Sequence, residues 1–401
     1  MSAPAGGGIP RYRPTRLPPL FSQGFRPFFL AAAIWSALAV ALWIPFIAGR
    51  LDLPTHFDPP AWHAHEMLFG FALPAMAGFL LTTIPNWTGR MPLQGVPLVC
   101  LALAWLAGRL AIAGSAIIGG AVAAILDLAF PVLLLLALGR EIVAGRNWRN
   151  LPMLGGLGLL IAANAQMHLY AGGVSDDRRL GWALAIAVLA AMIGLVGGRI
   201  IPSFTRNYLA RRGGAALPAP FGAIDRAALT LVPLALLAWI AEIDALTAGT
   251  LLLAAGIALA ARLARWRAAA TLGDALLWPL HLGYAWLALG LSLLGLGELW
   301  PDWPPAAGLH AVTAGAIGSM ILAVMARATL AHTGRRATAL PGTALLQLLV
   351  SLSALLRIAA AFASDWYLPL LTVAGLAWIA AFALFALVYG RLLLLPAHRG
   401  R

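Results

Sequence analysis

The residues of this chain that could carry chemistry are a few histidines, carboxylates and arginines inside long apolar segments. Residues 62–67 read WHAHEM and hold His63, His65 and Glu66. Further ionisable candidates lie singly in other apolar segments: Arg109, His168, His310 and Arg357. Ionisable groups at membrane depth are costly and are usually functional. These seven residues are therefore the first candidates for a site.

The chemistry that these residue types favour is metal and cofactor binding. Neutral histidine nitrogen suits haem iron, copper and zinc, so His63, His65, His168 and His310 are candidate ligands. A haem also brings two propionates, for which buried arginines are good partners. We therefore expect the two arginines of the set to contact a cofactor.

Helix geometry limits how the WHAHEM segment can act. Residues two apart on a helix point about 200° apart. His63 and His65 therefore cannot face one metal unless His63 precedes the helix. His63 can share a face with Glu66 or with Met67. We expect one histidine to be a ligand, while Glu66 orients a ring or relays a proton as the candidate catalytic carboxylate.

A smaller group of two histidines is predicted near the inner face. His281 and His332 could form a second ligand pair, or a proton or headgroup contact, and an interfacial role is the simpler interpretation for His332. His56 in a Pro-rich outer loop is interpreted as an interfacial residue in contact with water, and His398 near the C-terminus is interpreted as solvated.

A purely structural role is the alternative for the polar residues of the apolar segments. The outer histidines could be interfacial side chains in contact with water. His168 follows Asn164 by one helical turn, so these two could form a hydrogen-bonded pair. Asp127 could neutralise the charge of Arg109 on the preceding helix, which is a structural role. A functional role of Asp127 in proton uptake is the alternative.

The elements that must position these residues are membrane-spanning helices. Of the 401 residues, 62% are hydrophobic and 10% are charged, against roughly 45–50% and about 25% in soluble proteins. So few charges cannot cover a soluble protein, which excludes a soluble enzyme, a nucleic-acid binder and a disordered chain. The net charge of +13 comes from 27 basic residues, all arginine, between apolar runs, which is typical of topology signals. The single cysteine, Cys100, excludes an intrachain disulfide.

Span counting predicts an all-α polytopic membrane protein with about twelve helices, because each crossing needs about 20 apolar residues. The transmembrane domain covers residues 25–391, between cytoplasmic tails at 1–24 and 392–401. The first apolar run is too long for a cleaved signal core and is expected to be retained. The predicted spans are 25–48, 64–85, 96–113, 117–138, 151–171, 180–201, 227–241, 246–264, 275–296, 310–330, 344–363 and 367–389.

The arginine distribution supports this count and fixes the orientation. With the N-terminus inside, 22 of the 27 arginines fall in cytoplasmic segments, three fall outside and two lie within spans. This asymmetry follows the positive-inside rule and places both termini in the cytoplasm. The same alternation places the seven candidate residues in one layer near the outer face, on five different helices.

A weak internal repeat suggests three four-helix units. An offset of 245 residues pairs His65 with His310 and Gly70 with Gly315. An offset of 117 residues pairs His65 with Trp182. The matched segments lie in the second, sixth and tenth spans, which are four helices apart.

Five segments of the chain match a known family, namely FSQGFRPFF at 21–29, WHAHEMLFG at 62–70, GRIIPSFT at 198–205, HAVTAGAIG at 310–318 and AHTGR at 331–335. In these segments the chain resembles the NnrS family of bacterial inner-membrane proteins. This resemblance implies a twelve-helix membrane protein with haem, expected to be of the b type, and copper. It also implies a role in nitric oxide metabolism, denitrification and protection against nitrosative stress, with an unidentified electron donor.

Helices in arcs of four also resemble the haem–copper oxidase and nitric oxide reductase superfamily, but the histidines differ. That superfamily places His-x-His on its tenth helix and further histidines on the sixth and seventh. Here His-x-His lies on the second predicted helix and the sixth and seventh have no histidine. A related architecture stays open, whereas a shared catalytic centre is not expected.

These observations leave three candidate functions for the chain. The leading one is a haem- and copper-binding protein that binds, senses or turns over nitric oxide, with catalysis left open. A twelve-helix secondary transporter of a small anion or metal–nitrosyl complex is the main rival, although residues 88–92 lack the motif of the major facilitator group. A factor that delivers haem is the third.

Overall fold

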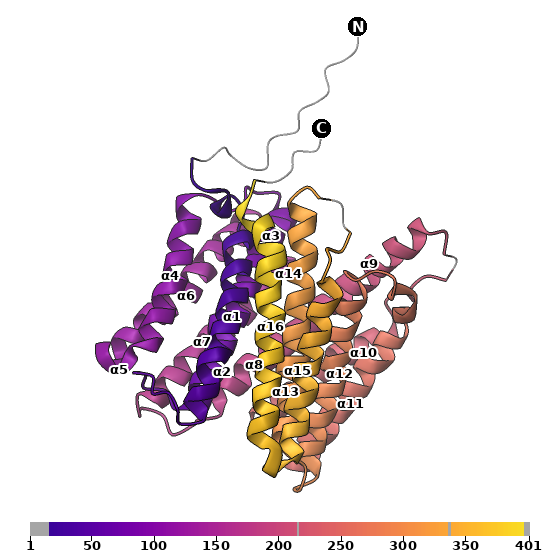
Figure 1. Cartoon of the computed structure of the whole chain (residues 1–401). Helices are drawn as coiled ribbons and strands as arrows, with labels where there is room; N and C mark the ends of the chain where they lie inside the picture. The colour runs from indigo at the N-terminus through magenta and orange to yellow at the C-terminus, as the bar shows by residue number, and fades with distance from the viewer. Residues whose placement is uncertain (1–15, 215, 336–337, 397–401) are drawn as a thin grey trace.

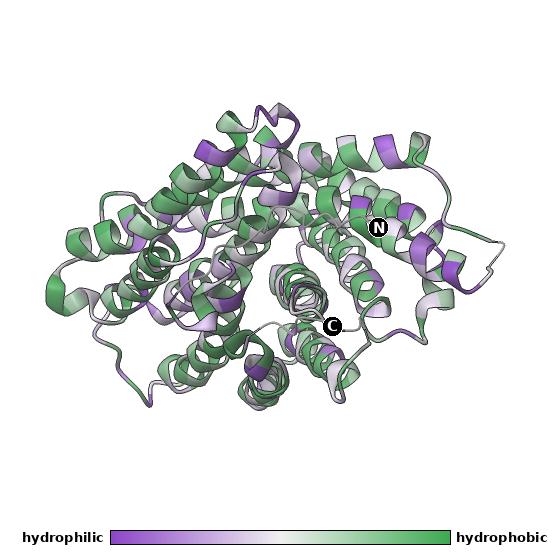
Figure 2. Cartoon of the chain, turned by 90° about the horizontal axis from the view of Figure 1, so that it is seen from above, coloured by the Kyte–Doolittle hydropathy of each residue, from purple (hydrophilic) through white to green (hydrophobic). Residues whose placement is uncertain are grey.

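The membrane domain is a bundle of long helices that run side by side (Figure 1). The computed structural model describes residues 16–214, 216–335 and 338–396, and these residues contain helices, turns and loops but no β-strand. Hydrophobic residues prevail along the helices, and many hydrophilic ones lie in loops (Figure 2). A helix satisfies its backbone amides within one segment, as hydrocarbon requires. The predicted all-α membrane fold is confirmed.

Eleven helices of the described residues are long and apolar enough to cross a membrane. Eight of them are continuous α-helices, and three consist of an α-helix, a π-helical segment and a second α-helix. The continuous ones are α1 (Phe25–Ile47), α4 (Val96–Ala113), α6 (Gly120–Ala144), α10 (Ala223–Ile240), α11 (Ala245–Ala264), α12 (Trp278–Leu299), α15 (Thr343–Phe362) and α16 (Tyr367–Leu394). The composite ones are α2–η2–α3 (Pro59–His65, Glu66–Ala72, Leu73–Thr88), α8–η4–α9 (Leu180–Met192, Ile193–Gly197, Gly198–Arg211) and α13–η6–α14 (Pro305–His310, Ala311–Gly318, Ser319–His332).

The remaining predicted span is helix α7, Leu151–Ala171, which has 21 residues but is less apolar than the other eleven. Asn164, Gln166 and His168 lower its hydropathy. Helix α7 packs against α6 and α8, so it belongs to the bundle. With α7, the described chain has the twelve long helices that the sequence predicted.

The three π-helical segments of the described residues fall in the second, sixth and tenth long helices, which is the predicted four-helix period. When 245 is added to the residue numbers of η2, the result is residues 311–317, which lie within η6, Ala311–Gly318. The offset of 117 carries η2 onto residues 183–189, whereas η4 begins ten residues later, at Ile193. The first and third units therefore share a register, and the second unit has its π-helical segment farther along the helix.

Side chains of neighbouring helices bind carbonyl groups of the π-helical segments. The Trp105 indole on α4 donates to the carbonyl of Gly70 in η2 at 3.2 Å. The Arg262 guanidinium on α11 donates to the carbonyl of Gly194 in η4 at 2.9 Å. A carbonyl that leaves the regular helical pattern needs such a donor where water is absent.

Two aligned glycines let tryptophans approach these segments closely. A Cβ atom on Gly70 would lie 2.7 Å from Cδ1 of Trp35 and 2.7 Å from Oε2 of Glu66. A Cβ atom on Gly315 would lie 2.7 Å from ring atoms of Trp286. Trp35 lies on α1 and Trp286 on α12, the first helices of the first and third units. In the first and third units, the repeat therefore extends to how the π-helical segment packs.

The first and last long helices lie against each other. The Arg26 guanidinium at the start of α1 donates to the carbonyls of Leu393 at 3.0 Å and Leu395 at 2.6 Å, beside the end of α16. Helix α16 continues to Leu394, three residues beyond the predicted domain end. Residues 1–15 and 397–401 of the predicted tails, with His398, lie outside the described residues.

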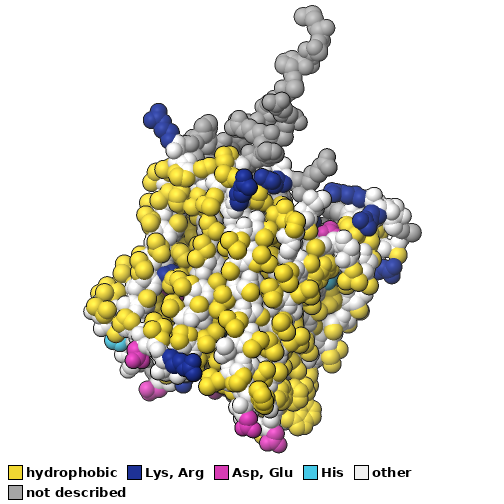
Figure 3. Space-filling model, in the orientation of Figure 1, with side chains coloured by type: hydrophobic (Ala, Val, Ile, Leu, Met, Phe, Trp, Pro, Cys, Tyr) yellow, Lys and Arg dark blue, Asp and Glu magenta, His cyan; other side chains and the backbone are white. Residues whose placement is uncertain are grey.

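Charged side chains mark the two ends of the bundle differently (Figure 3). Arginines gather at the end where α1 begins and α16 ends, while carboxylates and a smaller group of arginines lie at the opposite end. By the positive-inside rule, the arginine-rich end is the one expected on the cytoplasmic side. We name it the inner end and the opposite end the outer end.

Candidate functional site

Helix α2 and segment η2 carry two separate groups of polar residues near the outer end. Asp58 caps α2, with its Oδ1 accepting from the Ala61 amide at 2.8 Å. Two prolines follow the cap, which suits the first turn of a helix. From this fixed start, His63 points into a cavity, whereas His65 is fully buried on another face. The prediction that these histidines cannot face one metal from within a helix is confirmed.

The first group is a buried ionic cluster around Arg109 of α4. Its guanidinium bonds to Oε1 of Glu66 at 2.6 Å and forms a second ion pair with Asp127 of α6. His65 lies between the two carboxylates, with Nδ1 3.0 Å from Glu66 and Nε2 3.2 Å from Asp127. The predicted pairing of Asp127 with Arg109 is confirmed, and Glu66 contacts a histidine ring as expected.

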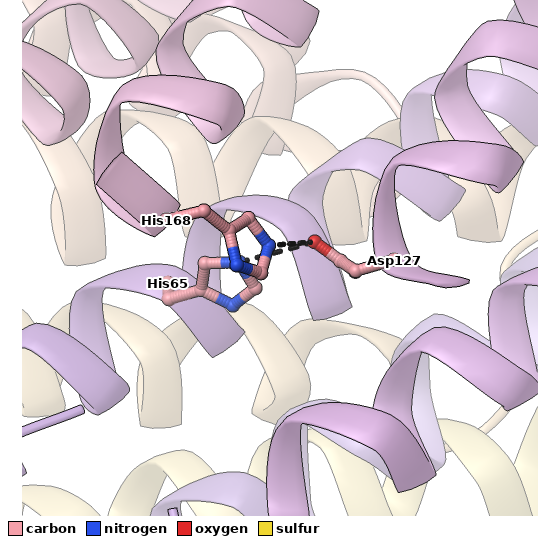
Figure 4. A group of neighbouring side chains, drawn as sticks. All are labelled: His65, Asp127 and His168. Carbon is pink, nitrogen blue, oxygen red and sulfur yellow. Dashed lines mark hydrogen bonds and ion pairs between the residues drawn. The ribbon is translucent and has the colours of Figure 1, made fainter. Parts of the chain in front are cut away.

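Helix α7 completes the ionic cluster. Asn164 donates to Oδ2 of Asp127 at 2.7 Å, and its Oδ1 lies 2.9 Å from Nε2 of His65. His168 contacts the same Asp127 oxygen through Nε2 at 3.1 Å. Both histidine rings turn toward Asp127 in Figure 4. Asn164 therefore bonds to His65 and Asp127, and not to His168. The alternative prediction of an Asn164–His168 hydrogen bond is wrong.

The ionic cluster could hold a metal ion. One ligand atom each from His65, Asp127 and His168 lies within 4.8 Å of the others. Two imidazoles and a carboxylate suit first-row transition metals. With neutral histidines, the two carboxylates exceed Arg109 by one negative charge, and a proton or a cation would balance that charge inside the membrane.

The second group lines a cavity of about 430 Å³ between η2, η6, α1, α15 and α16. Most of its wall is apolar, with Trp43, Phe71 and Trp378 among the aromatic side chains. Its ionisable side chains include His63, His310, Arg178 and Arg357. No carboxylate is among the described residues of this wall. The cavity therefore favours a largely apolar ligand with negative charge at one side.

His310 and Arg357 form a defined pair in the cavity wall. Nδ1 of His310 lies 2.7 Å from the carbonyl of Ala306, so this nitrogen carries the proton. Nε2 of His310 then holds a lone pair, which accepts from Nη2 of Arg357 at 2.7 Å. Metal-binding histidines usually donate their other ring N–H to a carbonyl or carboxylate in this way. His310 therefore has the tautomer of a ligand, and Arg357 occupies the nitrogen that a metal would use.

His63 faces the same cavity with unsatisfied nitrogen. Its ring stacks on Trp43 of α1, with centroids 3.9 Å apart. Its Nδ1 and Nη1 of Arg357 are both buried and have no hydrogen-bond partner among the described residues. Buried polar atoms without partners are rare and call for an explanation such as a ligand. Met67 also lines the cavity, whereas Glu66 belongs to the ionic cluster.

The seven outer candidates therefore divide between two groups. The ionic cluster takes His65, Glu66, Arg109 and His168, and the cavity takes the other three. Arg109 already forms ion pairs with two protein carboxylates. Its predicted contact with a cofactor is not needed to explain its position and stays a prediction.

The inner histidines have separate surroundings. Nε2 of His281 lies 2.9 Å from the Thr205 hydroxyl, which donates to the carbonyl of Ile201. The ring of His332 packs near Phe25, with centroids 5.7 Å apart. A shared metal site for His281 and His332 stays a prediction.

Comparison with protein-family models gives a match over nearly the whole chain. The sequence model described as NnrS protein matches residues 19–396, which include all twelve long helices and both polar groups. The chain belongs to the NnrS family. A search among curated proteins found no match to this NnrS family member. The resemblance seen in five short segments therefore extends over nearly the whole chain.

Sequence analysis of this NnrS protein missed two tryptophans of the site. Trp35 donates to Oε2 of Glu66 at 2.6 Å, and Trp43 stacks on His63. A tryptophan inside an apolar span is typical of a packed core, so its residue type gave no sign of a polar contact. The one sequence feature that could have indicated this contact is Gly70, because a glycine inside a span allows a large side chain such as Trp35 to approach closely.

Proposed function

We propose that this NnrS protein binds haem in the cavity and acts in nitric oxide metabolism at a bacterial inner membrane. The observation that carries the proposal is the cavity wall: two histidines and Arg357 without a carboxylate partner among the described residues, set in apolar surroundings. A volume of about 430 Å³ falls within the roughly 300–1,000 Å³ of small-molecule sites. These features fit a haem.

Each polar residue of the cavity then has a role toward the haem. One of His310 and His63 would supply an imidazole nitrogen to the haem iron, which would leave an iron position open. Arg357 would pair with a propionate, because a guanidinium can bind a carboxylate through two parallel hydrogen bonds. The carbonyl of Ala306 keeps the proton on Nδ1 of His310, so Nε2 keeps a lone pair. That lone pair accepts from Arg357 and would be open to iron when Arg357 bonds to a propionate instead. The aromatic and aliphatic wall excludes water from the remaining surface.

The copper that the resemblance implies would bind in the ionic cluster. His65, His168 and Asp127 offer two nitrogens and one oxygen at short range, and imidazole suits copper. Arg109 and Glu66 then act as supports, since Arg109 fixes the Asp127 carboxylate and Glu66 orients the His65 ring. The chain of contacts from Glu66 through His65 to Asp127 could also hold a proton.

Nitric oxide is the small molecule that this arrangement suits. Reduced iron or copper with an open position binds this gas. An uncharged diatomic molecule dissolves in the membrane and enters an apolar cavity without losing hydrogen bonds to water. Capture of the gas would protect the cell from nitrosative stress, and turnover would require an electron donor as a further partner.

Purified protein gives the direct test. We expect wild-type protein to contain iron and copper and to show a haem spectrum. His63→Ala and His310→Ala should each shift the spectrum or remove most of the haem, whereas His56→Ala, in an exposed loop, should leave it unchanged. Nitric oxide consumption by reduced protein in liposomes then separates binding from turnover. Haem spectra that are unchanged in both cavity variants would refute the assignment of this cavity.

Arg357 also favours a second candidate function, transport of a small anion. A guanidinium without a carboxylate partner among the described residues can bind such a solute in the cavity. A colourless, metal-free preparation that moves an anion across liposomes would support the transporter. Loss of transport in Arg357→Gln, with helix content unchanged, would place the anion beside this residue.

A further inference from the structure

A second cavity with a different character lies at the inner end. It has a volume of about 410 Å³ and lies between α9, the beginning of α10 and the loop that joins them. Arg199, Ser203 and Arg206 line it from α9, and Pro220 and Phe221 line it from the loop. Neither the cavity proposed for haem nor the ionic cluster shares these residues. We name it the arginine groove.

The sequence spacing of α9 explains the polar wall of the arginine groove. Arg199, Ser203 and Arg206 are separated by four and three residues, so they lie on one face of the helix. All three are exposed. Arg206 donates to the carbonyl of Pro218 at 3.2 Å, and Arg199 has no polar partner among the described residues. Two cationic side chains and a hydroxyl therefore face the same space.

The opposite wall is held in place by a bonded network. Arg265, which directly follows α11, donates to the carbonyl of Pro220 at 2.8 Å and to Oδ2 of Asp225 at 2.7 Å. Asp225 also accepts from the Gly222 amide at 2.9 Å and from Arg262 at 2.8 Å. These bonds fix the loop against α11, so the groove is a built feature of the fold.

The arginine groove carries a strong excess of positive charge. Arg199, Arg206, Arg262 and Arg265 line it or support its wall, against the single carboxylate of Asp225. This leaves three positive charges at the arginine-rich inner end. A ligand of the groove would therefore be anionic and oxygen-rich, as phosphate groups are.

The other half of the lining is apolar and favours a lipid over a free ion. Leu195, Pro202 and Leu229 line the groove. Phe221 is 62% exposed at its edge, and Ile224, nearby on α10, is 40% exposed. A phosphodiester bearing acyl chains can use both halves, whereas inorganic phosphate can use only the arginines. Basic pockets between helices on the cytoplasmic side commonly bind anionic headgroups.

We propose that the arginine groove binds the headgroup of an anionic phospholipid of the inner leaflet. The phosphodiester contacts Arg199 and Arg206, with Ser203 between them, and the acyl chains run past Phe221 along α10. This site is independent of the function proposed for the outer cavity, because no residue is shared.

The test compares two double variants of the same helix with the same change in charge. Arg199→Gln/Arg206→Gln alters the groove, and Arg211→Gln/Arg212→Gln removes two exposed arginines at the end of α9. Full-length protein is titrated with phosphatidylglycerol in a phosphatidylcholine background, and bound lipid is counted by native mass spectrometry. We expect the groove variant to bind phosphatidylglycerol about 30-fold more weakly, since each arginine near an anionic surface contributes about a five-fold effect. The control variant should bind like wild type.

Three outcomes would overturn the proposal. Equal losses in both double variants would mean that general surface charge attracts the lipid. Unchanged binding in the groove variant, with helix content intact by circular dichroism, would place the lipid elsewhere. Inorganic phosphate that raises thermal stability as much as phosphatidylglycerol does would identify a soluble anion as the ligand. Haem content is measured in parallel, and its loss without loss of lipid binding would concern only the outer cavity.

Discussion

At the scale of single residues, the polar side chains of this NnrS protein are organised by charge balance. The ionic cluster pairs Arg109 with two carboxylates, while Arg357 in the cavity contacts His310 and has no carboxylate among the described residues. Arg109 therefore has a structural role, whereas Arg357 can still bind a ligand. The same residue type has two roles because its neighbours differ.

Asp127 tests how much the ionic cluster contributes to the fold. Asp127→Asn in metal-free protein should lower the free energy of unfolding by about 3–5 kcal/mol, because it breaks a buried ion pair and leaves Arg109 undercompensated. Glu141→Gln, which removes a partly exposed pair with Arg90, should change it by less than about 1 kcal/mol. Unfolding in detergent with increasing denaturant measures both. Equal effects of the two substitutions would contradict a structural role for the cluster.

At the scale of elements, the three π-helical segments distinguish the second helix of each unit. Such segments often mark functional sites. Segment η2 begins at Glu66, and η6 begins directly after His310. Both polar groups near the outer end therefore lie where a helix changes its winding, and the packing of Trp35 against Gly70 belongs to the same feature.

Gly70 provides the test of this packing. Gly70→Ala would bring a Cβ atom against Trp35 and Glu66, so it should destabilise the protein by about 1–3 kcal/mol through overpacking and alter tryptophan fluorescence. The matched control is Gly155→Ala on α7, where nothing lies within 4 Å of the added atom. That change should be neutral or stabilise by up to about 1 kcal/mol. Similar results for the two glycines would show that η2 can shift to accept a side chain.

At the scale of the whole molecule, the even number of long helices places both ends of the described chain together. Helix α7 is decisive for this count because it is the least apolar of the twelve. Its polar residues are tolerated because Asn164 and His168 bond to the ionic cluster rather than contact lipid. We therefore expect α7 to cross the membrane, because its neighbours satisfy its polar groups.

Cysteine labelling tests the crossing of α7. In a Cys100→Ala background, Asp176→Cys in the loop after α7 should react in intact cells with a membrane-impermeant thiol reagent. Arg212→Cys, after α9, should react only when the cells are opened. Both positions are exposed, so access depends on the side of the membrane. Protection of position 176 in intact cells would mean that α7 does not cross and that the alternation of arginines has another cause.

The sequence by itself determined the membrane class, the twelve helices and the family. Composition and the spacing of apolar runs fix these properties, because hydrocarbon admits few structures and each needs a set length. The segment WHAHEM also predicted that His63 and His65 face different ways. Helix periodicity is local, so it can be derived from a few residues.

Only the tertiary structure decided how the outer residues divide between the cavity and the ionic cluster. His65 meets Asn164 across 99 positions of the chain, and His310 meets Arg357 across 47. Such contacts depend on how helices rotate and pack, which is set by Gly70, by the π-helical segments and by the sum of many neighbouring side chains. Depth in the membrane follows from counting residues, whereas the choice of partner depends on packing between helices.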